Sequence, residues 1–178
     1  MVLNLKEGSS MNSAIMMKRQ KYASTITKKD YLGRIETILD YFYSHHKHVG
    51  NHKTHTRLPQ FILPNQCIVT GLDDRPGIKL HAEHIVPLAY IRKVIFEEIE
   101  KRGKAARKDL QVFLVRSLQV MMVERDLAKA LDKTKLKTEM PENWDYKMGC
   151  VYERINTMYE ALNIKELYYF NEPLWLSS

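Results

Sequence analysis

Cysteine and long apolar runs are both scarce in this sequence of 178 residues. Two cysteines are present, Cys67 and Cys150, which argues against a disulfide framework. No apolar run approaches the roughly 18 residues that a membrane-spanning helix needs. No secretory signal peptide is recognisable in the sequence. We therefore expect a cytoplasmic protein that does not span a membrane.

Positive charge dominates most of the chain, whose formal net charge is +7. Residues 1–58 hold 10 Lys and Arg against 4 Asp and Glu, and residues 79–137 hold 14 against 8. Residues 138–178 hold 3 against 7. A polyanion would approach the first two regions and be repelled by the third. The 44% of hydrophobic residues suffices for one core, so we expect one compact domain with an extended N-terminal portion.

Three segments follow from the pattern of the sequence. Residues 1–58 are predicted to form a basic arm, a helix over about 28–45 capped by Thr27, and a His-rich linker. Residues 59–137 form the central segment, with a helical insertion. Residues 138–178 are predicted to form a helix introduced by residues 140–143, followed by an aromatic tail that packs on the core. A partner surface is the alternative for this tail. The buried faces of the two terminal helices are predicted to consist of Tyr31, Ile35, Ile38, Leu39 and Phe42, and of Val151, Ile155, Met158 and Leu162.

The clearest chemical signal is Glu83-His84, at the end of an apolar strand that Pro87 terminates. A carboxylate binds hard divalent cations, and an imidazole with a pKa near 6.5 can accept a proton from water at neutral pH. The pair therefore suits metal-assisted hydrolysis. His81 lies two residues earlier on the same strand face. It is either a further ligand or substrate contact, or a packed structural histidine.

A second stretch, residues 117–129, leads from an apolar strand into a helix. Val123, Leu127 and Leu131 recur at four-residue spacing and are predicted to face the strands. Asp126 lies about 60° round the helix from Val123, at the edge of this stripe, from which it can reach the strand end. Lys129 shares that edge and either contacts a phosphate oxygen or pairs with Asp126. Taken alone, Asp126 is typical of an exposed helix acid.

Together, residues 80–88 and 117–129 resemble the HNH endonuclease family, the ββα-metal nucleases. The family pattern is an Asp/Glu/His-His-Ile-x-Pro strand, then Asn-Leu-Gln-x-Leu-Cys-x-x-Cys-Asn/His-x-x-Lys entering a helix. Leu118-Gln119, Met121, Asp126 and Lys129 match it in register. The resemblance covers about residues 66–135. It implies an α+β fold with a ββα-metal (HNH) core, a small antiparallel hairpin plus a helix, embedded here in several additional helices.

This sequence departs from the family pattern at two places. Many members bind a structural zinc through two Cys-x-x-Cys pairs, but here only Cys67 remains, and Met122 and Arg125 stand in the second pair. We expect no structural zinc, because such a site needs four ligands. Ser117 stands where the family has the Asn that bridges the loop in front of the catalytic His.

The resemblance implies a metal-dependent endonuclease that hydrolyses the phosphodiester bonds of DNA. His84 would deprotonate the attacking water, while Glu83 and Asp126 would hold one divalent ion, Mg²⁺ by default, or Mn²⁺ or another divalent cation. A bacterial or phage-infected cell is the expected setting, and a homodimer is one open oligomeric state. Two alternatives are a nucleic-acid-binding protein on an inactivated HNH scaffold and an RNA-directed nuclease or toxin, since the catalytic residues touch only phosphate.

The insertion between the two stretches is predicted to form two helices that break at Gly103. The basic segment at the break is either a solvated junction or a turn that contacts phosphates. The candidate nucleic-acid-binding residues are Arg92, Lys93, Lys101, Arg102, Lys104, Arg107 and Lys108.

Residues 45–55 hold five of the seven histidines. This segment has three interpretations: a solvated linker, a nucleic-acid contact, or a second metal site.

Overall fold

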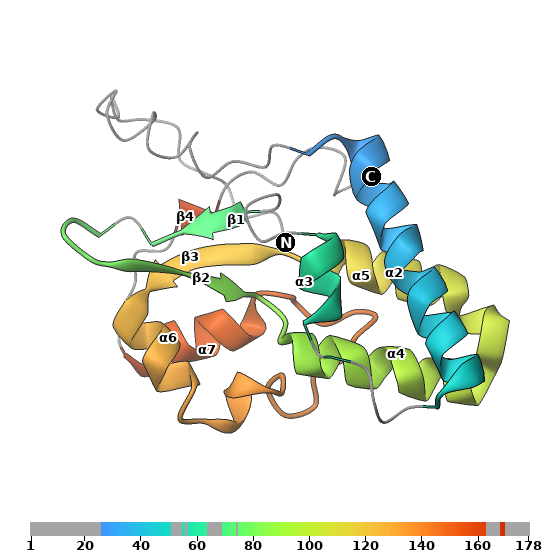
Figure 1. The fold of residues 1–178 in the computed structure, drawn as a ribbon. Helices are drawn as coiled ribbons and strands as arrows, with labels where there is room; N and C mark the ends of the chain where they lie inside the picture. Colours follow the sequence, from blue (N-terminus) through green and yellow to red (C-terminus); the bar gives the residue numbers. More distant parts are fainter. Residues whose placement is uncertain are drawn as a thin grey trace.

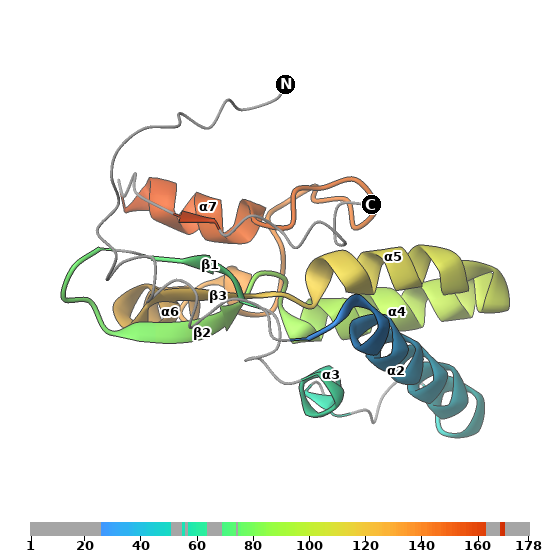
Figure 2. The ribbon, with the colours of Figure 1, turned by 90° about the horizontal axis from the view of Figure 1, so that it is seen from above.

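The computed structural model describes residues 26–50, 55, 57–63, 69–73, 75–162 and 168–169. Helices α6 (Arg125–Leu131) and α7 (Glu153–Ala161) lie against one face of a small sheet, as Figure 1 shows. Helices α2 (Lys28–His48), α4 (Leu88–Arg102) and α5 (Arg107–Ser117) form a group beside the sheet (Figure 2). The predicted α+β class is confirmed.

The sheet has four strands in the order β2-β3-β1-β4. Their bounds are β1 (Val69–Leu72), β2 (Leu80–His84), β3 (Val120–Glu124) and β4 (Tyr168–Tyr169). Strands β2 and β3 are antiparallel, with Leu80 opposite Glu124 and His84 opposite Val120. This confirms the expected antiparallel pairing. Strand β1 runs parallel to β3 on its other side, and β4 pairs antiparallel with β1. The aromatic tail thus returns to the sheet at Tyr168–Tyr169, and its other residues lie outside the described part of the chain.

Helix α2 begins where the sequence predicts and ends three residues later than expected. The Thr27 hydroxyl accepts a hydrogen bond from the Asp30 backbone nitrogen, as an N-cap does. All five residues of its predicted apolar stripe are fully buried. The Tyr31 hydroxyl donates to the Val115 carbonyl oxygen at 2.8 Å, which ties α2 to α5. The short helix α3 (Leu58–Ile62) follows, and Arg34 of α2 donates to its last carbonyl at 2.5 Å.

Helices α4 and α5 form an insertion between the paired strands β2 and β3. The 3₁₀ turn η2 (Gly103–Ala106) joins them, and Gly103 adopts φ 54° and ψ −135°. This conformation is essentially restricted to glycine, so the predicted break at this residue is confirmed. The insertion packs against α2, and its buried residues join one core with those of α2, α6 and α7. The three predicted segments therefore share a core.

The prediction that a helix begins at about residue 140 is wrong. After the 3₁₀ turn η3 (Lys135–Lys137), the chain makes a series of turns, and α7 begins only at Glu153. The Asp145 carboxylate accepts hydrogen bonds from the backbone nitrogens of Lys147 and Met148, a local alternative to helix. The Trp144 indole donates to the Cys150 carbonyl at 2.8 Å. Leu162, predicted to be buried, has an exposed fraction of 48%.

Within the described ranges, no helix is both long and apolar enough to span a membrane.

Candidate functional site

The end of strand β2 opens into a hollow of about 400 Å³. His81, Glu83 and His84 all line it, so the structure brings these three predicted site residues together. Successive side chains of a strand point to opposite faces, and this hollow is lined by residues of both faces of the edge strand β2. The other residues lining it are Arg57 and Gln60 of the α3 region, Pro87, Leu88 and Ala89 at the start of α4, Ala82 of β2, and Lys137 and Thr138 after α6.

Arg154 of α7 is the residue that the sequence analysis missed at this site. Its side chain is fully buried and forms an ion pair with Glu83. It also donates to the carbonyl oxygens of His84 at 2.7 Å and Leu136 at 2.8 Å. One arginine therefore holds the carboxylate, the strand end and the loop before α7 together. The signal was present in the sequence, because Arg154 lies three residues after Val151, on the predicted buried face of the helix.

Burial dominates the electrostatics of the Glu83–Arg154 pair. It raises the pKa of the Glu83 carboxyl, and the positive charge of Arg154 acts in the opposite direction. Burial also lowers the pKa of Arg154, against the pull of Glu83. Asp132, at the end of α6, is near enough to contribute to both shifts. A buried pair of this kind is costly to break, because the remaining charge stays in a poorly solvated place.

His84 is neutral at physiological pH. Burial, together with the positive charges of Arg154 and Arg57, lowers its pKa from 6.5 to about 4. A neutral imidazole has one ring nitrogen with a free lone pair, which can accept a proton. The imidazole is thus unprotonated and able to accept a proton, and its lowered pKa makes it a weaker base than a solvent-exposed histidine.

The turn after His84 is tied to the start of β3. The Ile85 backbone nitrogen donates to the Gln119 carbonyl at 3.1 Å, and the Gln119 side chain accepts from the Tyr152 hydroxyl at 3.1 Å. Ser117, which stands at the family's bridging Asn, is fully buried. Its hydroxyl has no hydrogen-bond partner among the described residues. The backbone of Gln119 therefore makes the link to this turn.

Asp126 lies away from Glu83 in this structure. Glu83 pairs with Met121, whereas Asp126 follows Glu124, which pairs with Leu80 at the other end of β2. Leu80 and Glu83 are three residue steps apart along β2, or about 10 Å. Asp126 is exposed and bound by Lys129 at 2.8 Å, one of the two arrangements expected for Lys129.

The described residues do not fit the predicted metal site as it stands. No group of three or more His, Cys, Asp or Glu side chains that could hold a metal ion occurs in the described part of the chain. Arg154 binds Glu83 through one carboxylate oxygen, Oε1. Asp126 lines a different hollow from Glu83. Mg²⁺ binding by Glu83 and Asp126 therefore stays a prediction.

This second hollow, of about 490 Å³, lies at the opposite end of β2. It is formed by the turn between β1 and β2 and by the start of α6. Its lining consists of Pro76, Gly77, Ile78, Lys79, Glu124, Arg125, Asp126 and Lys129. Its charged residues all come from the ends of β2 and β3 and from the first turns of α6.

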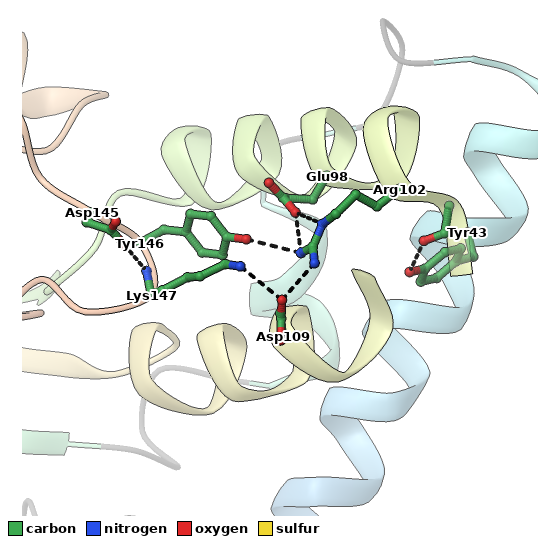
Figure 3. Close-up of polar contacts among 8 residues, drawn as sticks. Tyr43, Glu98, Arg102, Asp109, Asp145, Tyr146 and Lys147 are labelled. Carbon is green, nitrogen blue, oxygen red and sulfur yellow. Dashed lines mark hydrogen bonds and ion pairs between the residues drawn. The ribbon is translucent and has the colours of Figure 1, made fainter. Parts of the chain in front are cut away.

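The basic turn, residues 101–108, lies at the far end of α4 from His84. Fifteen residues of helix put about 22 Å between the two ends of α4. Arg102 pairs with Glu98 and with Asp109 at 2.8 Å, and Lys147 reaches Asp109 at 3.1 Å, as Figure 3 shows. Arg107 pairs with Glu36 and Asp40 of α2. Both arginines of this turn are thus engaged within the protein.

The remaining basic candidates, Lys101, Lys104 and Lys108, are exposed on the same turn. Lys93 is exposed on α4, and Arg92 beside it is partly buried. Phosphate contacts by these residues stay a prediction.

The described histidines of the His-rich segment are divided between a helix and a loop. His45 and His46 lie in the last turns of α2, with their rings 6.1 and 6.3 Å from the Phe96 ring. His55 lies against Phe61 of α3. His52 falls outside the described residues, as does Cys67. Contacts with aromatic rings thus account for the positions of His45, His46 and His55. A metal site or a nucleic-acid contact in this segment stays a prediction.

No family model, curated protein or solved structure matches this chain. The resemblance to the HNH endonucleases therefore rests on the sequence motifs alone.

Proposed function

We propose that this chain is an endonuclease that hydrolyses phosphodiester bonds of DNA, with His84 as the general base and Mg²⁺ as the expected cofactor. One observation carries the proposal: the partly buried imidazole of His84 lines a hollow that is also lined by two cations, Arg57 and Lys137. A phosphodiester is an anion, and guanidinium and ammonium groups are its usual partners.

The chemistry assigned to this chain is the movement of one proton. A phosphate held by Arg57 and Lys137 would lie beside the imidazole of His84. The attacking water gives a proton to the free ring nitrogen as its oxygen bonds to phosphorus, the bond from phosphorus to the 3′ oxygen breaks, and the leaving 3′ oxygen takes a proton from solvent. Arg154 acts through its neighbours, because it fixes the carbonyl of His84 and the carboxylate of Glu83.

A divalent ion bound at Glu83 would stabilise the charge that develops on the phosphate. The Oε2 atom of Glu83 would be its ligand, since Arg154 binds Oε1. The second protein ligand in this arrangement is not Asp126, which lines the other hollow. We therefore assign no step of the reaction to the ion.

Incubation with supercoiled plasmid, single-stranded DNA and RNA, in Mg²⁺, Mn²⁺ or EDTA, tests the proposal. We expect DNA cleavage with a divalent cation, and a loss of about 10²–10⁴-fold in His84→Ala. His46→Ala, at the end of α2, is the matched control and should cleave normally. Full activity of His84→Ala would contradict the assignment of the base, and cleavage of RNA alone would contradict DNA as the substrate.

A nucleic-acid-binding protein without nuclease activity is the second candidate function. The observation that favours it is the ion pair of Glu83 with Arg154, together with the position of Asp126 at the other hollow. Such an arrangement leaves the cations of the hollow able to bind phosphate without a metal ion. Binding of DNA with no cleavage in any divalent cation would favour this candidate.

A further inference from the structure

We propose that a polynucleotide backbone lies along the free edge of β2 and α6, with Lys79 and Arg125 binding phosphates that flank the one at His84. This inference rests on the proposed function and extends it to the path of the substrate. We call the surface formed by Lys79, Arg125 and Lys129 the basic edge.

The two hollows lie at opposite ends of one strand. Strand β2 is the edge strand of the sheet, so on its outer side no other described strand covers it. Lys79 immediately precedes β2 and lines one hollow, and Glu83 lies near its end and lines the other. They are four residue steps apart along the strand, or about 13 Å. A ligand that fills both hollows must therefore be a chain, and a single phosphate group is too short.

Helix α6 leads in the same direction. Its first residue, Arg125, donates from its backbone nitrogen to the Lys79 carbonyl at 2.7 Å, which fixes the start of the helix beside the start of β2. Its last turn brings Asp132 to the Glu83–Arg154 pair. The start of α6 thus lies beside the start of β2, and the residue after its last turn lies near Glu83.

The basic edge has more positive than negative charge. Glu124 is held by Arg75 at 2.5 Å, and Asp126 is bound by Lys129. The pKa of Asp126 is lowered chiefly by the hydrogen bond from Lys129, with contributions from the charges of Arg125 and Lys79. Three cations therefore gather round one carboxylate. All three are exposed and accessible to a polyanion.

The composition of the two hollows indicates how the strand is recognised. Neither lining contains Phe, Tyr or Trp among the described residues, so the rings available for base stacking are the imidazoles of His81 and His84 alone. Cations, amides and hydroxyls contact phosphates and sugars, which carry no direct sequence information. We therefore expect binding that depends little on base sequence.

Fluorescence anisotropy with labelled duplex DNA, single-stranded DNA and single-stranded RNA, in EDTA and over a range of NaCl, tests the path. The edge variant is Lys79→Gln/Arg125→Gln. The charge-matched comparison is Lys101→Gln/Lys104→Gln, in the basic turn. For the edge variant we expect a smaller slope of log K against log salt, by up to about 0.9 per lost contact on duplex and about 0.7 on single strands. The comparison variant tests the competing prediction that the basic turn contacts phosphates, and it should keep the wild-type slope if the backbone follows the basic edge instead.

Several outcomes would overturn the inference: an unchanged slope in the edge variant, an equal loss in the turn variant, or no binding of any of the three nucleic acids. Both variants change only exposed side chains, and circular dichroism checks that they fold. Cleavage is measured separately on wild-type protein. If binding depends on the basic edge but no cleavage occurs, the nuclease proposal is refuted and the proposed path of the backbone stands. If the wild-type protein cleaves but the edge variant binds with the wild-type salt dependence, the path is refuted and the nuclease proposal stands.

Discussion

The basic turn and the basic edge both carry clustered Lys and Arg, but their cations have different surroundings. At the turn, Arg102 meets an acid one helical turn away and another on α5, while Arg107 meets two acids of α2. At the edge, the cations share the single carboxylate of Asp126. A run of positive residues in sequence thus predicts an exposed surface, whereas free charge depends on which acids the fold brings near.

The arginines that form structural ion pairs also differ in burial between the two ends of the molecule. Arg102 and Arg107 lie partly exposed, where water screens their ion pairs and each contributes little. Arg154, at the opposite end of β2 from the basic edge, is fully buried and has three protein acceptors. Replacing each of these arginines with a neutral residue therefore tests whether they differ in their contribution to stability.

The largest effect is expected from Arg154→Met. Removing one member of a buried pair leaves an uncompensated charge on Glu83, and we expect a loss of about 3–5 kcal/mol in the free energy of unfolding. Urea denaturation measures it. Arg102→Met, the matched variant at the turn, should lose much less. The double variant Glu83→Gln/Arg154→Met should recover part of the loss, and a double variant no more stable than Arg154→Met would refute the pair as the cause.

The pH dependence of stability gives the next largest effect. The folded pKa of His84, about 4, lies below the unfolded value near 6.5, so the unfolded chain binds more protons between these values. Stability from this group is complete above pH 6.5 and is lost as pH falls toward 4, to a total of about 3 kcal/mol. Unfolding in urea from pH 4.5 to 7.5 should show a shallower dependence in His84→Gln. Identical profiles would show that His84 titrates normally.

A smaller effect is expected from Gly103→Ala. The backbone at this residue has φ 54° and ψ −135°, a region that costs a side-chain-bearing residue about 1–3 kcal/mol. The variant should lower the unfolding free energy but leave nucleic-acid affinity unchanged, because the basic edge is distant. Gly33→Ala is the control: a Cβ there meets nothing within 4 Å in helix α2, so it should stabilise by up to about 1 kcal/mol. Weaker DNA binding by Gly103→Ala would indicate that the basic turn is part of the DNA-binding surface.

The smallest effect, and the sharpest distinction, is expected from Asp126→Asn. If Asp126 serves only to hold Lys129, its neutralisation leaves the basic edge more positive, and anisotropy should show a few-fold tighter binding with cleavage retained. If it is a metal ligand, cleavage should fall and recover partly at high Mg²⁺ or Mn²⁺. Asp109→Asn, which releases Arg102 at the turn, should alter neither binding nor cleavage.

Much of the fold could be predicted from periodicity and local signals. The stripe of α2 and its Thr27 cap, and the break at Gly103, follow from the spacing of apolar residues, from side-chain capping and from backbone sterics. The antiparallel pairing of β2 with β3 was expected only from the resemblance to the HNH motif. The start of α7 could not, because Asp145 offers the backbone hydrogen bonds that compete with helix.

The site was predictable only where its residues are neighbours in sequence. Glu83 and His84 lie together because one strand carries them. Asp126 was expected at the same place from its angle on a helix, but angle alone does not give position along the strand, which depends on the register of β2 and β3. Arg154 comes from a helix distant in sequence, and no local pattern says which carboxylate it will meet.

The insertion of α4 and α5 between two paired strands has a consequence for the order of folding. Strands β2 and β3 become neighbours only when the ends of residues 85–119 meet, and closing so long a segment as a coil costs conformational entropy. The helices need only local contacts, which form faster than distant strand pairs. We therefore expect the amides of α4 and α5 to gain hydrogen-exchange protection before those of β2 and β3 during refolding. His84 then acquires its buried surroundings in the last stage of folding.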